Sequence, residues 1–129
     1  MDVSPHRVAA PAPPPVPTGR GTGGCCPYYH DAIELIGRRW TGAIIAVLLS
    51  APEPLRFSEI SAAVPQLSDR LLSERMKELE ARGFIVRDVH PGPPVRVTYT
   101  LTDMGRGLGP AIKALHDWAR AWMSPAARA

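Results

Sequence analysis

The stretch that decides the fold reads LRFSEISAAVPQLSDRLLSERMKELEARGFIVRDVH over residues 55–90 and PGPPVRVTYTL over residues 91–101. Its first ten residues predict a two-turn helix, because apolar side chains recur there at helical spacing. These side chains are Phe57, Ile60, Ala63 and Val64. Pro65 ends that helix, since a proline biases the residue before it away from the helical region. The connector that follows, residues 65–67, is only three residues long, which suits a helix-turn-helix.

A longer second helix is expected over residues 68–82. Ser68 is a good N-cap for it, and Asp69 lies favourably at the positive end of the helix dipole. Gly83 is placed to end the helix in a left-handed conformation. The expected buried stripe is Leu72, Met76 and Leu79 with Leu71 beside it, and the opposite face carries Arg70, Ser73, Glu74 and Lys77.

Two strands are predicted after this helix, over residues 84–89 and 95–101. The second alternates Val95, Val97, Tyr99 and Leu101 on one face with Arg96, Thr98 and Thr100 on the other. The segment PGPP between them cannot lie inside a sheet and forms the hairpin tip. This order of elements is typical of a winged helix-turn-helix, a unit that places its second helix in the major groove of DNA. A small α+β domain without a nucleic-acid role is the alternative, because fold alone does not fix function.

The flanking segments predict one domain with two tails. Residues 1–24 hold six of the fifteen prolines and four of the eleven glycines, which predicts a disordered tail. The domain is expected over residues 25–123, with a C-terminal tail over residues 124–129. It should begin with a helix that ends at Gly37. A second apolar helix follows, in which Ala43, Ile44, Val47 and Leu48 face the core and Ile45 and Leu49 flank them.

A last long helix is expected from the N-cap Thr102 to about Met123. Its apolar stripe is Leu108, Ile112, Leu115, Ala119 and Trp122, with Trp118 next to it. This stripe exceeds what one small domain needs to cover, so it predicts a dimer interface. A two-fold dimer also suits a palindromic DNA site. The alternative is a helix that folds back on its own domain. The expected fold is therefore mainly α with a small β-hairpin: a winged helix-turn-helix with an extra N-terminal helix and a long C-terminal dimerisation helix.

Composition narrows the function classes. The 129 residues carry a net charge of +3 and a pI near 9.2, which agrees with DNA binding. No run of 18 apolar residues and no secretory signal is present in the sequence, so a bacterial-type cytoplasm is expected. The four histidines share no metal or catalytic spacing, and no phosphate loop or Ser-His-Asp set occurs. Neither an enzyme nor a cofactor is expected.

Several motifs occur in one order along the chain. They are CP at residues 26–27, LIGRRW at 35–40, RFSEI at 56–60, LSDRLLSERMKELE at 67–80, PVRVTYTLT at 94–102, and Trp118 in the last helix. In this order and spacing the chain resembles the HxlR-type family of bacterial winged helix-turn-helix regulators over residues 25–123. It is especially similar to the thiol-based quinone and diamide sensors of that family.

The resemblance implies a homodimer whose interface is made by the first and last helices, with one recognition helix in each subunit. It also implies that Cys26, just before the first helix, is the sensing cysteine. Two features depart from the family pattern: the position is doubled as Cys25 and Cys26, and a long proline-rich arm precedes it. The expected function is a repressor of palindromic operators that is released when quinones, electrophiles or oxidants modify the thiol.

The chemistry of the two cysteines leaves several alternatives open. Neighbouring cysteines rarely pair with each other, because the disulfide would strain the backbone. Cys26 lies at the mouth of a helix, whose dipole favours a thiolate. The alternatives are two plain surface thiols, a soft-metal site made by Cys25, Cys26 and His30, or a non-covalent aromatic ligand at the dimer interface. Tyr28, Tyr29 and Trp118 are candidates to line an effector pocket.

Roles in DNA contact follow from the expected helix face. Ser68 is expected to bind a phosphate, and Arg70 and Ser73 to contact base edges. Arg75 and Lys77 are expected nearer the phosphates. Arg56, Arg87 and Arg96, which lie around the hairpin, should add phosphate affinity. A winged-helix module that binds only protein is the competing interpretation.

Overall fold

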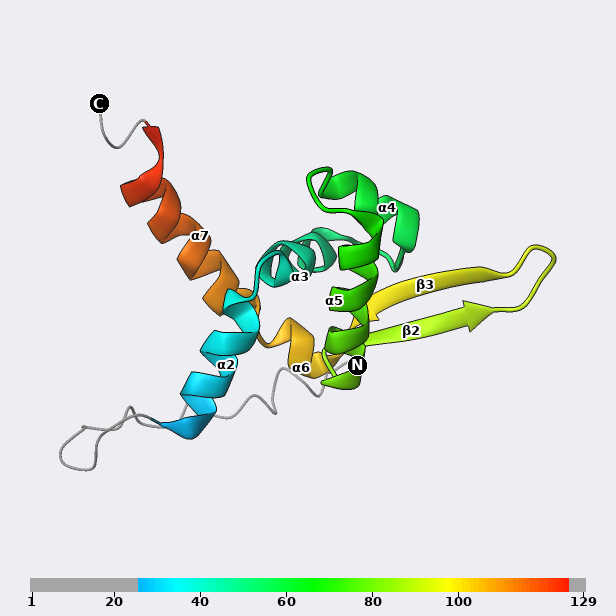
Figure 1. The fold of residues 1–129 in the computed structure, drawn as a ribbon, viewed down its shortest axis with the longest axis horizontal. Helices are drawn as coiled ribbons and strands as arrows, with labels where there is room; N and C mark the ends of the chain where they lie inside the picture. Colours follow the sequence, from blue (N-terminus) through cyan, green and yellow to red (C-terminus); the bar gives the residue numbers. More distant parts are fainter. Residues whose placement is uncertain (1–25, 126–129) are drawn as a thin grey trace, which may run out of the picture. The chain divides into compact units, whose positions relative to one another are not determined.

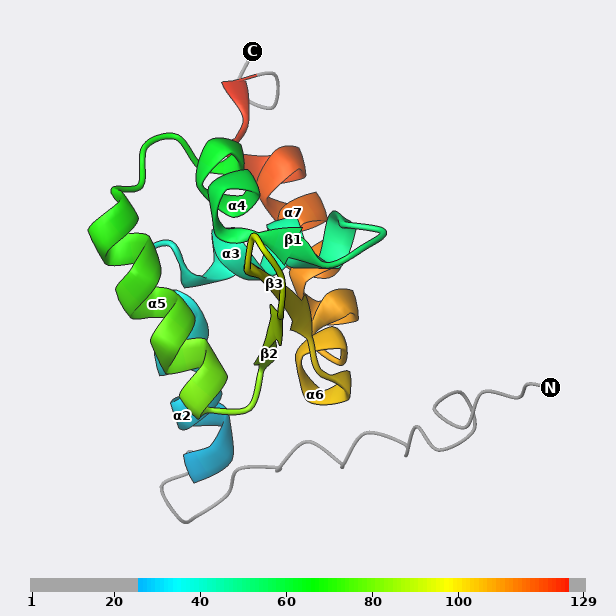
Figure 2. The ribbon, with the colours of Figure 1, turned by 90° about the vertical axis from the view of Figure 1, so that its right-hand side faces the viewer.

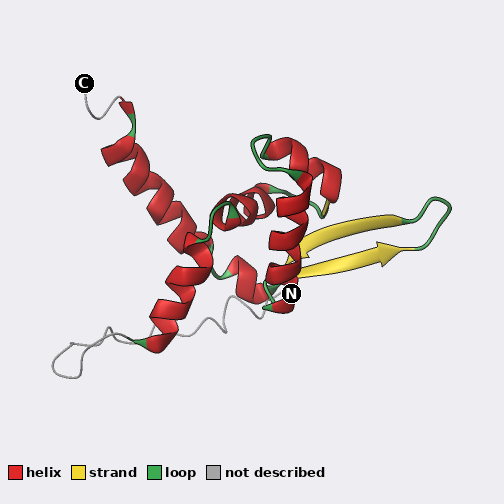
Figure 3. Ribbon diagram, in the orientation of Figure 1, coloured by secondary structure: helices red, strands yellow, loops and turns green. Residues whose placement is uncertain are grey.

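Helices dominate the structure, a computed structural model that describes residues 26–125 (Figures 1 and 3). The helices are α2 (Pro27–Gly37), α3 (Thr41–Ser50), α4 (Phe57–Ala63), α5 (Asp69–Ala81), α6 (Asp103–Arg106) and α7 (Gly109–Met123). The strands are β1 (Leu55–Arg56), β2 (Ile85–His90) and β3 (Arg96–Leu101). The predicted tail over residues 1–24 lies outside the described residues, as do Cys25 and residues 126–129. Within residues 26–125, no helix is long and apolar enough to span a membrane.

The chain divides into two compact units, residues 1–34 and residues 35–129. The described part of the first unit is Cys26 and the turns of α2 up to Glu34. The second unit holds the end of α2 and all later elements.

The second unit is a winged helix-turn-helix, which confirms the expected fold class. Helices α4 and α5 form the helix-turn-helix, and β2 and β3 form the hairpin, which is the wing. Figure 2 shows α5 on one side of the wing and α6 on the other. The sheet has the order β1-β3-β2 and is antiparallel throughout. Strand β1 was not predicted, because its two residues are too few to show an alternating pattern.

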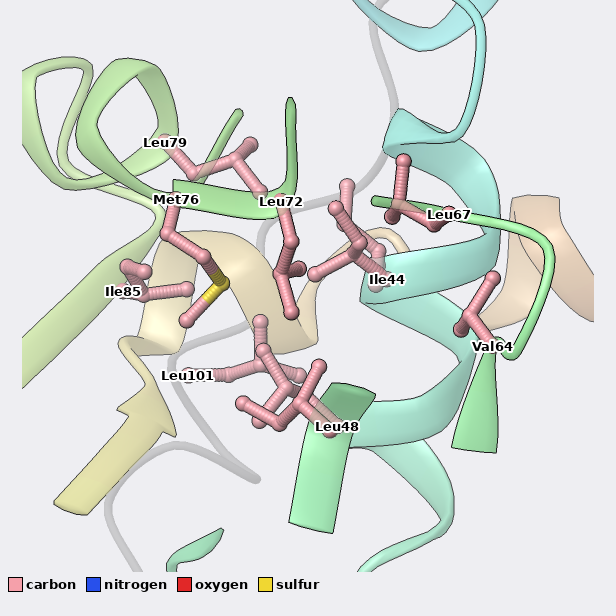
Figure 4. Close-up of a cluster of buried hydrophobic side chains, with 11 residues drawn as sticks. Ile44, Leu48, Val64, Leu67, Leu72, Met76, Leu79, Ile85 and Leu101 are labelled. Atoms are coloured by element: carbon pink, nitrogen blue, oxygen red, sulfur yellow. The ribbon is translucent and has the colours of Figure 1, made fainter. Parts of the chain in front are cut away.

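The core of this unit is formed mainly by α3, α4, α5 and the base of the wing (Figure 4). Its buried side chains are Ile44, Ile45, Leu48, Ile60, Val64, Leu67, Leu72, Met76, Leu79, Ile85 and Leu101. The predicted stripe of α5 is confirmed. The prediction for α3 was partly wrong, since Ile45 is fully buried while Ala43 and Val47 are only partly buried. Ala63, expected on the apolar stripe of α4, is exposed.

Both predicted ends of α5 are confirmed. The Ser68 hydroxyl accepts a hydrogen bond from the Leu71 backbone N–H at 3.1 Å, so Ser68 is the N-cap. Gly83 follows the helix with a φ of 84°, a left-handed conformation that favours glycine. The chain can therefore turn directly from α5 into the wing.

The predicted single C-terminal helix was wrong in one respect, because the segment is two helices. Thr102 caps α6 as predicted, and its hydroxyl accepts a hydrogen bond from the Gly105 N–H at 3.1 Å. Helix α6 ends after one turn, and α7 begins at Gly109 with Pro110 in its first turn. Proline has no N–H to bond the carbonyl four residues earlier, so the α6 ladder cannot continue through Pro110.

Candidate nucleic-acid interface, elbow and cysteine

The start of α5 is tied to α4. The Ser61 hydroxyl donates a hydrogen bond to the Asp69 carboxylate at 2.7 Å. Since Ser61 belongs to α4, this bond joins the two helices of the helix-turn-helix. Asp69 therefore has a structural partner beside its favourable place at the helix N-terminus.

One face of α5 is open to solvent and carries the residues predicted to contact DNA. The Arg70 side chain is 91 % exposed and forms only a long ion pair with Glu74, at 3.8 Å. Lys77 is exposed on the same face and Ser73 is half-buried. An exposed arginine in the first turn of such a helix has the reach and the paired donors to contact a guanine edge.

Arg75, which was expected near the DNA phosphates, has a largely covered side chain. Its side chain is only 12 % exposed, and its Nε donates a hydrogen bond to the Arg39 carbonyl at 3.1 Å. Its Nη1 also lies 3.6 Å from the Glu78 carboxylate. This geometry ties Arg75 to the segment before α3 and does not favour the phosphate contact that the sequence suggested.

A cleft of about 320 Å³ lies between α5 and the wing. Its lining residues are Phe57, Ser73, Met76, Lys77, Glu80, Arg87 and Tyr99. Arg87 and Tyr99 are cross-strand partners, so they share the face of the wing that borders this cleft. The cleft combines two cations and two hydroxyls with one carboxylate, Glu80, so its charged side chains carry a net positive charge that suits a phosphate group. The sequence predicted that Arg87 adds phosphate affinity around the wing, and in the structure it lines this cleft.

The other two predicted cations lie around the wing. Arg56 is exposed at the start of α4, where its backbone N–H donates a hydrogen bond to the Glu59 carboxylate at 2.8 Å. Arg96 is exposed and pairs with His90 across the wing. Because side chains alternate along a strand, Arg96 and Arg87 lie on opposite faces of the wing.

A short elbow, defined here as residues 37–40, joins α2 to α3. Trp40 has a φ of 77°, which is unusual for a bulky residue and costs roughly 1–3 kcal/mol of backbone strain. The Arg39 guanidinium lies 5.1 Å from the centre of the Trp40 ring, a cation–π contact. Arg38 lies 3.1 Å from the Glu78 carboxylate of α5. The Arg38–Glu78 ion pair was not predicted, because its two residues are far apart in the sequence.

Cys26 is a free, partly buried cysteine immediately before α2. Its backbone carbonyl accepts a hydrogen bond from the His30 N–H at 3.0 Å, so the thiol is attached where the helix begins. Tyr28 and Tyr29, the expected pocket residues of α2, are 84 % and 63 % exposed. Across residues 26–125, no group of three His, Cys, Asp or Glu side chains is arranged to hold a metal ion.

The apolar stripe of α7 is packed against the core at its start and exposed to solvent farther along the helix. Leu108, just before α7, and Ile112 pack against the core of their own unit. Leu115, Trp118 and Trp122 are exposed, Trp122 by 69 %. On the polar side of α7, the Lys113 ammonium donates a hydrogen bond to Asp117 at 2.9 Å. That bond and the charge of Lys113 hold the pKa of the Asp117 carboxyl below its usual value.

A helix-turn-helix with an open recognition face, a wing and a basic cleft between them defines a DNA-binding transcriptional regulator. The chain belongs to the HxlR-like helix-turn-helix family, whose pattern matches residues 35–127. It is 46 % identical over 100 residues to YvaP of Bacillus subtilis, an uncharacterised HTH-type transcriptional regulator. That match covers 78 % of this chain and 91 % of YvaP.

A second relative, the transcriptional regulator YodB of Bacillus subtilis, is 41 % identical over 100 residues, which cover 78 % of this chain and 88 % of YodB. The reduced form of YodB superposes with a TM-score of 0.69, over 79 % of this chain and 98 % of YodB. The quinone-bound form of YodB, 39 % identical, gives a TM-score of 0.64 over 74 % of this chain and 97 % of YodB. These findings confirm the resemblance to the family and to a relative that binds a quinone.

Proposed function

We propose that this regulator is a homodimeric repressor of palindromic operators, released when a quinone, another electrophile or an oxidant modifies Cys26. The observation that carries the DNA-binding part is the open face of α5 beside the cleft that holds Lys77 and Arg87. The sensing part is supported by the partly exposed thiol at the start of α2 and by the likeness to YodB, which has been solved with quinone bound.

In this proposal α5 enters the major groove. Arg70 and Ser73 contact base edges, and Ser68 at the helix start binds a phosphate. Lys77 and Arg87 hold a second phosphate in the cleft. Arg56 and Arg96 add contacts to the DNA backbone around the wing, while Arg75 supports α5 from the side of the elbow.

The sensing chemistry needs only the thiol and the electrophile. The Cys26 sulfur adds to a ring carbon of a benzoquinone and the thiol proton ends on one quinone oxygen, while the proton on the attacked carbon moves to the other oxygen as the ring becomes aromatic. The product is a hydroquinone thioether, so no further oxidant is needed. With diamide, two thiols lose two electrons and two protons to form a disulfide, and the diamide becomes the hydrazine. Because neighbouring cysteines pair poorly, the second thiol would come from another copy of the chain.

Dimerisation is assigned to the exposed half of α7. Leu115, Trp118 and Trp122 form an apolar surface that a second copy would cover. Two recognition helices then meet two half-sites about 34–36 Å apart, so a change in their spacing weakens both contacts.

The test compares the wild type with Cys25→Ser and Cys26→Ser by fluorescence anisotropy on the DNA upstream of the chain's own gene, at fixed moderate salt. Benzoquinone is expected to weaken binding of the wild type and Cys25→Ser by about tenfold or more, within the usual range of allosteric coupling. Cys26→Ser should keep its affinity. Equal release of Cys26→Ser and the wild type would exclude sensing through this thiol, and no specific binding by the folded dimer would favour the protein-interaction module.

A non-covalent effector is the second candidate function, and one observation favours it. A hollow of about 350 Å³ lies between α3 and α7. Its lining residues are Ala46, Leu49, Ser50, Gly109, Ile112, Lys113 and His116. An apolar floor with a few polar groups at the rim suits a small aromatic molecule. This hollow becomes the first place to look if Cys26→Ser is released like the wild type.

A further inference from the structure

The elbow between α2 and α3 is fastened to the recognition helix by two contacts, the Arg38–Glu78 ion pair at 3.1 Å and the hydrogen bond from Arg75 to the Arg39 carbonyl at 3.1 Å. A third contact, the Arg75–Glu78 ion pair at 3.6 Å, joins the two α5 residues to each other. We refer to Arg38, Arg75 and Glu78 together as the clamp. All of them lie in the second unit, and none is on the face of α5 that carries Arg70 and Lys77.

We propose that the clamp residues are positioning residues that make α5 follow the elbow, so that a change at the start of α2 alters the orientation of the recognition helix. This inference rests on the proposed function, because it assigns the route by which modification of Cys26 would reach the DNA-binding face.

The backbone of the elbow is tightly constrained. The backbone turns tightly there, with the Arg38 N–H bonded to the Leu35 carbonyl and the Thr41 N–H bonded to the Arg38 carbonyl. Trp40 is held in a left-handed conformation and packs against the core. Helix α2 runs without interruption from Pro27 into this turn. Because α2 ends at Gly37, the first residue of the elbow, a displacement along this helix would reach the elbow directly.

The strength of the clamp lies mainly in Arg75. Its side chain is almost fully covered, and a hydrogen bond from a covered guanidinium is stronger than one in water. Arg38 and Glu78 are more exposed, so their pair is expected to be weaker. Glu78 binds both arginines, so its neutralisation weakens both ion pairs while the Arg75–Arg39 hydrogen bond remains.

Arg75 and Glu78 alternate along α5 with the core residues. Met76 and Leu79 attach the same turns of the helix to the core, so loosening the clamp leaves α5 folded in place. The clamp residues are therefore suited to couple the elbow to the orientation of α5, whereas the core residues hold α5 in the fold.

The test is the anisotropy assay with benzoquinone on wild type, Glu78→Gln and Arg38→Met. Glu78→Gln is expected to bind the operator DNA within about threefold of the wild type before treatment, and to lose about fivefold less affinity after it. Mass spectrometry should show the same rate of adduct formation at Cys26. Arg38→Met, which removes one ion pair only, should reduce the loss of affinity in the same direction but by a smaller factor, and Arg38→Lys, which keeps the charge, should respond like the wild type. Glu53→Gln makes the same chemical change in an exposed loop and is the matched control.

The outcomes distinguish the proposed release by modification of Cys26 from the proposed role of the clamp. If the wild type keeps its affinity after adduct formation, the proposed function fails, and this inference with it. If the wild type is released and both clamp variants are released equally, the inference alone is overturned. Should Glu78→Gln not bind DNA at all, Arg38→Met decides by the same criterion, because it leaves the Arg75 contacts intact.

Discussion

At the scale of single residues, position on α5 decides the role of each cation. Arg70, Arg75 and Lys77 belong to one helix, yet Arg75 is covered while Arg70 and Lys77 are exposed. Helical periodicity predicted the faces of Arg70 and Lys77. It could not place Arg75, because the carbonyl that receives its hydrogen bond lies 36 positions away in the sequence.

Substitution of Arg70 by Ala should cost about 1–3 kcal/mol of binding free energy on the best operator and relax the preference at one base pair. Lys77→Ala and Arg87→Ala should weaken all DNA sequences about equally, because the cleft is expected to hold a phosphate. Each should also lower the salt dependence of binding by about one counterion. Anisotropy on a set of single-base operator variants, repeated at several salt concentrations, measures both effects. An unchanged base preference in Arg70→Ala would contradict the assigned helix face.

At the scale of elements, local signals predicted α4, α5 and the wing well. Ser68 and Gly83 mark the ends of α5 because capping depends on residues next to one another. Strand β1 and the break between α6 and α7 were not predicted from the sequence. The break lies at Gly107, Gly109 and Pro110, residue types that disfavour a continuous helix. Ile45 was misplaced because α3 is apolar nearly all round, so periodicity could not select its buried face.

The contact between α6 and the start of the wing depends on Gly105. An added Cβ there would lie 2.4 Å from the Phe84 carbonyl oxygen and 2.9 Å from a Leu101 methyl carbon. Gly105→Ala is therefore expected to destabilise the fold by about 1–3 kcal/mol. The melting temperature, measured by circular dichroism at fixed protein concentration, should fall by several degrees.

Gly37→Ala is the matched control for that measurement. A Cβ at Gly37 would meet nothing within 4 Å, and no left-handed conformation is required there. Its melting temperature should stay unchanged or rise slightly, since alanine favours helix more than glycine does. A fold equally tolerant of both substitutions would contradict the close packing of α6 on the wing.

At the scale of the whole molecule, the exposed half of α7 is the surface that we propose for dimerisation. Trp122→Ala removes the most exposed aromatic side chain of the apolar surface and should raise the dimer dissociation constant by about tenfold or more, as expected for an interfacial tryptophan. Sedimentation velocity over a range of concentrations measures this constant. Arg120→Ala, on the polar side of the same helix, should leave it unchanged. A monomeric wild type would refute the proposed dimer.

Helix α7 is anchored by one end and exposed at the other, so in the proposed dimer its angular phase would determine the operator geometry. Each residue of a helix adds 1.5 Å of length and 100° of rotation. Between Ile112, which is packed inside, and Leu115, which is exposed, the number of residues thus fixes both the direction and the height of the surface offered to a second copy. Inserting one residue there would swing that surface by more than a quarter turn while leaving every DNA contact of the single subunit intact. Relatives with the same recognition helix but a different phase in this segment would then read the same half-site at a different spacing.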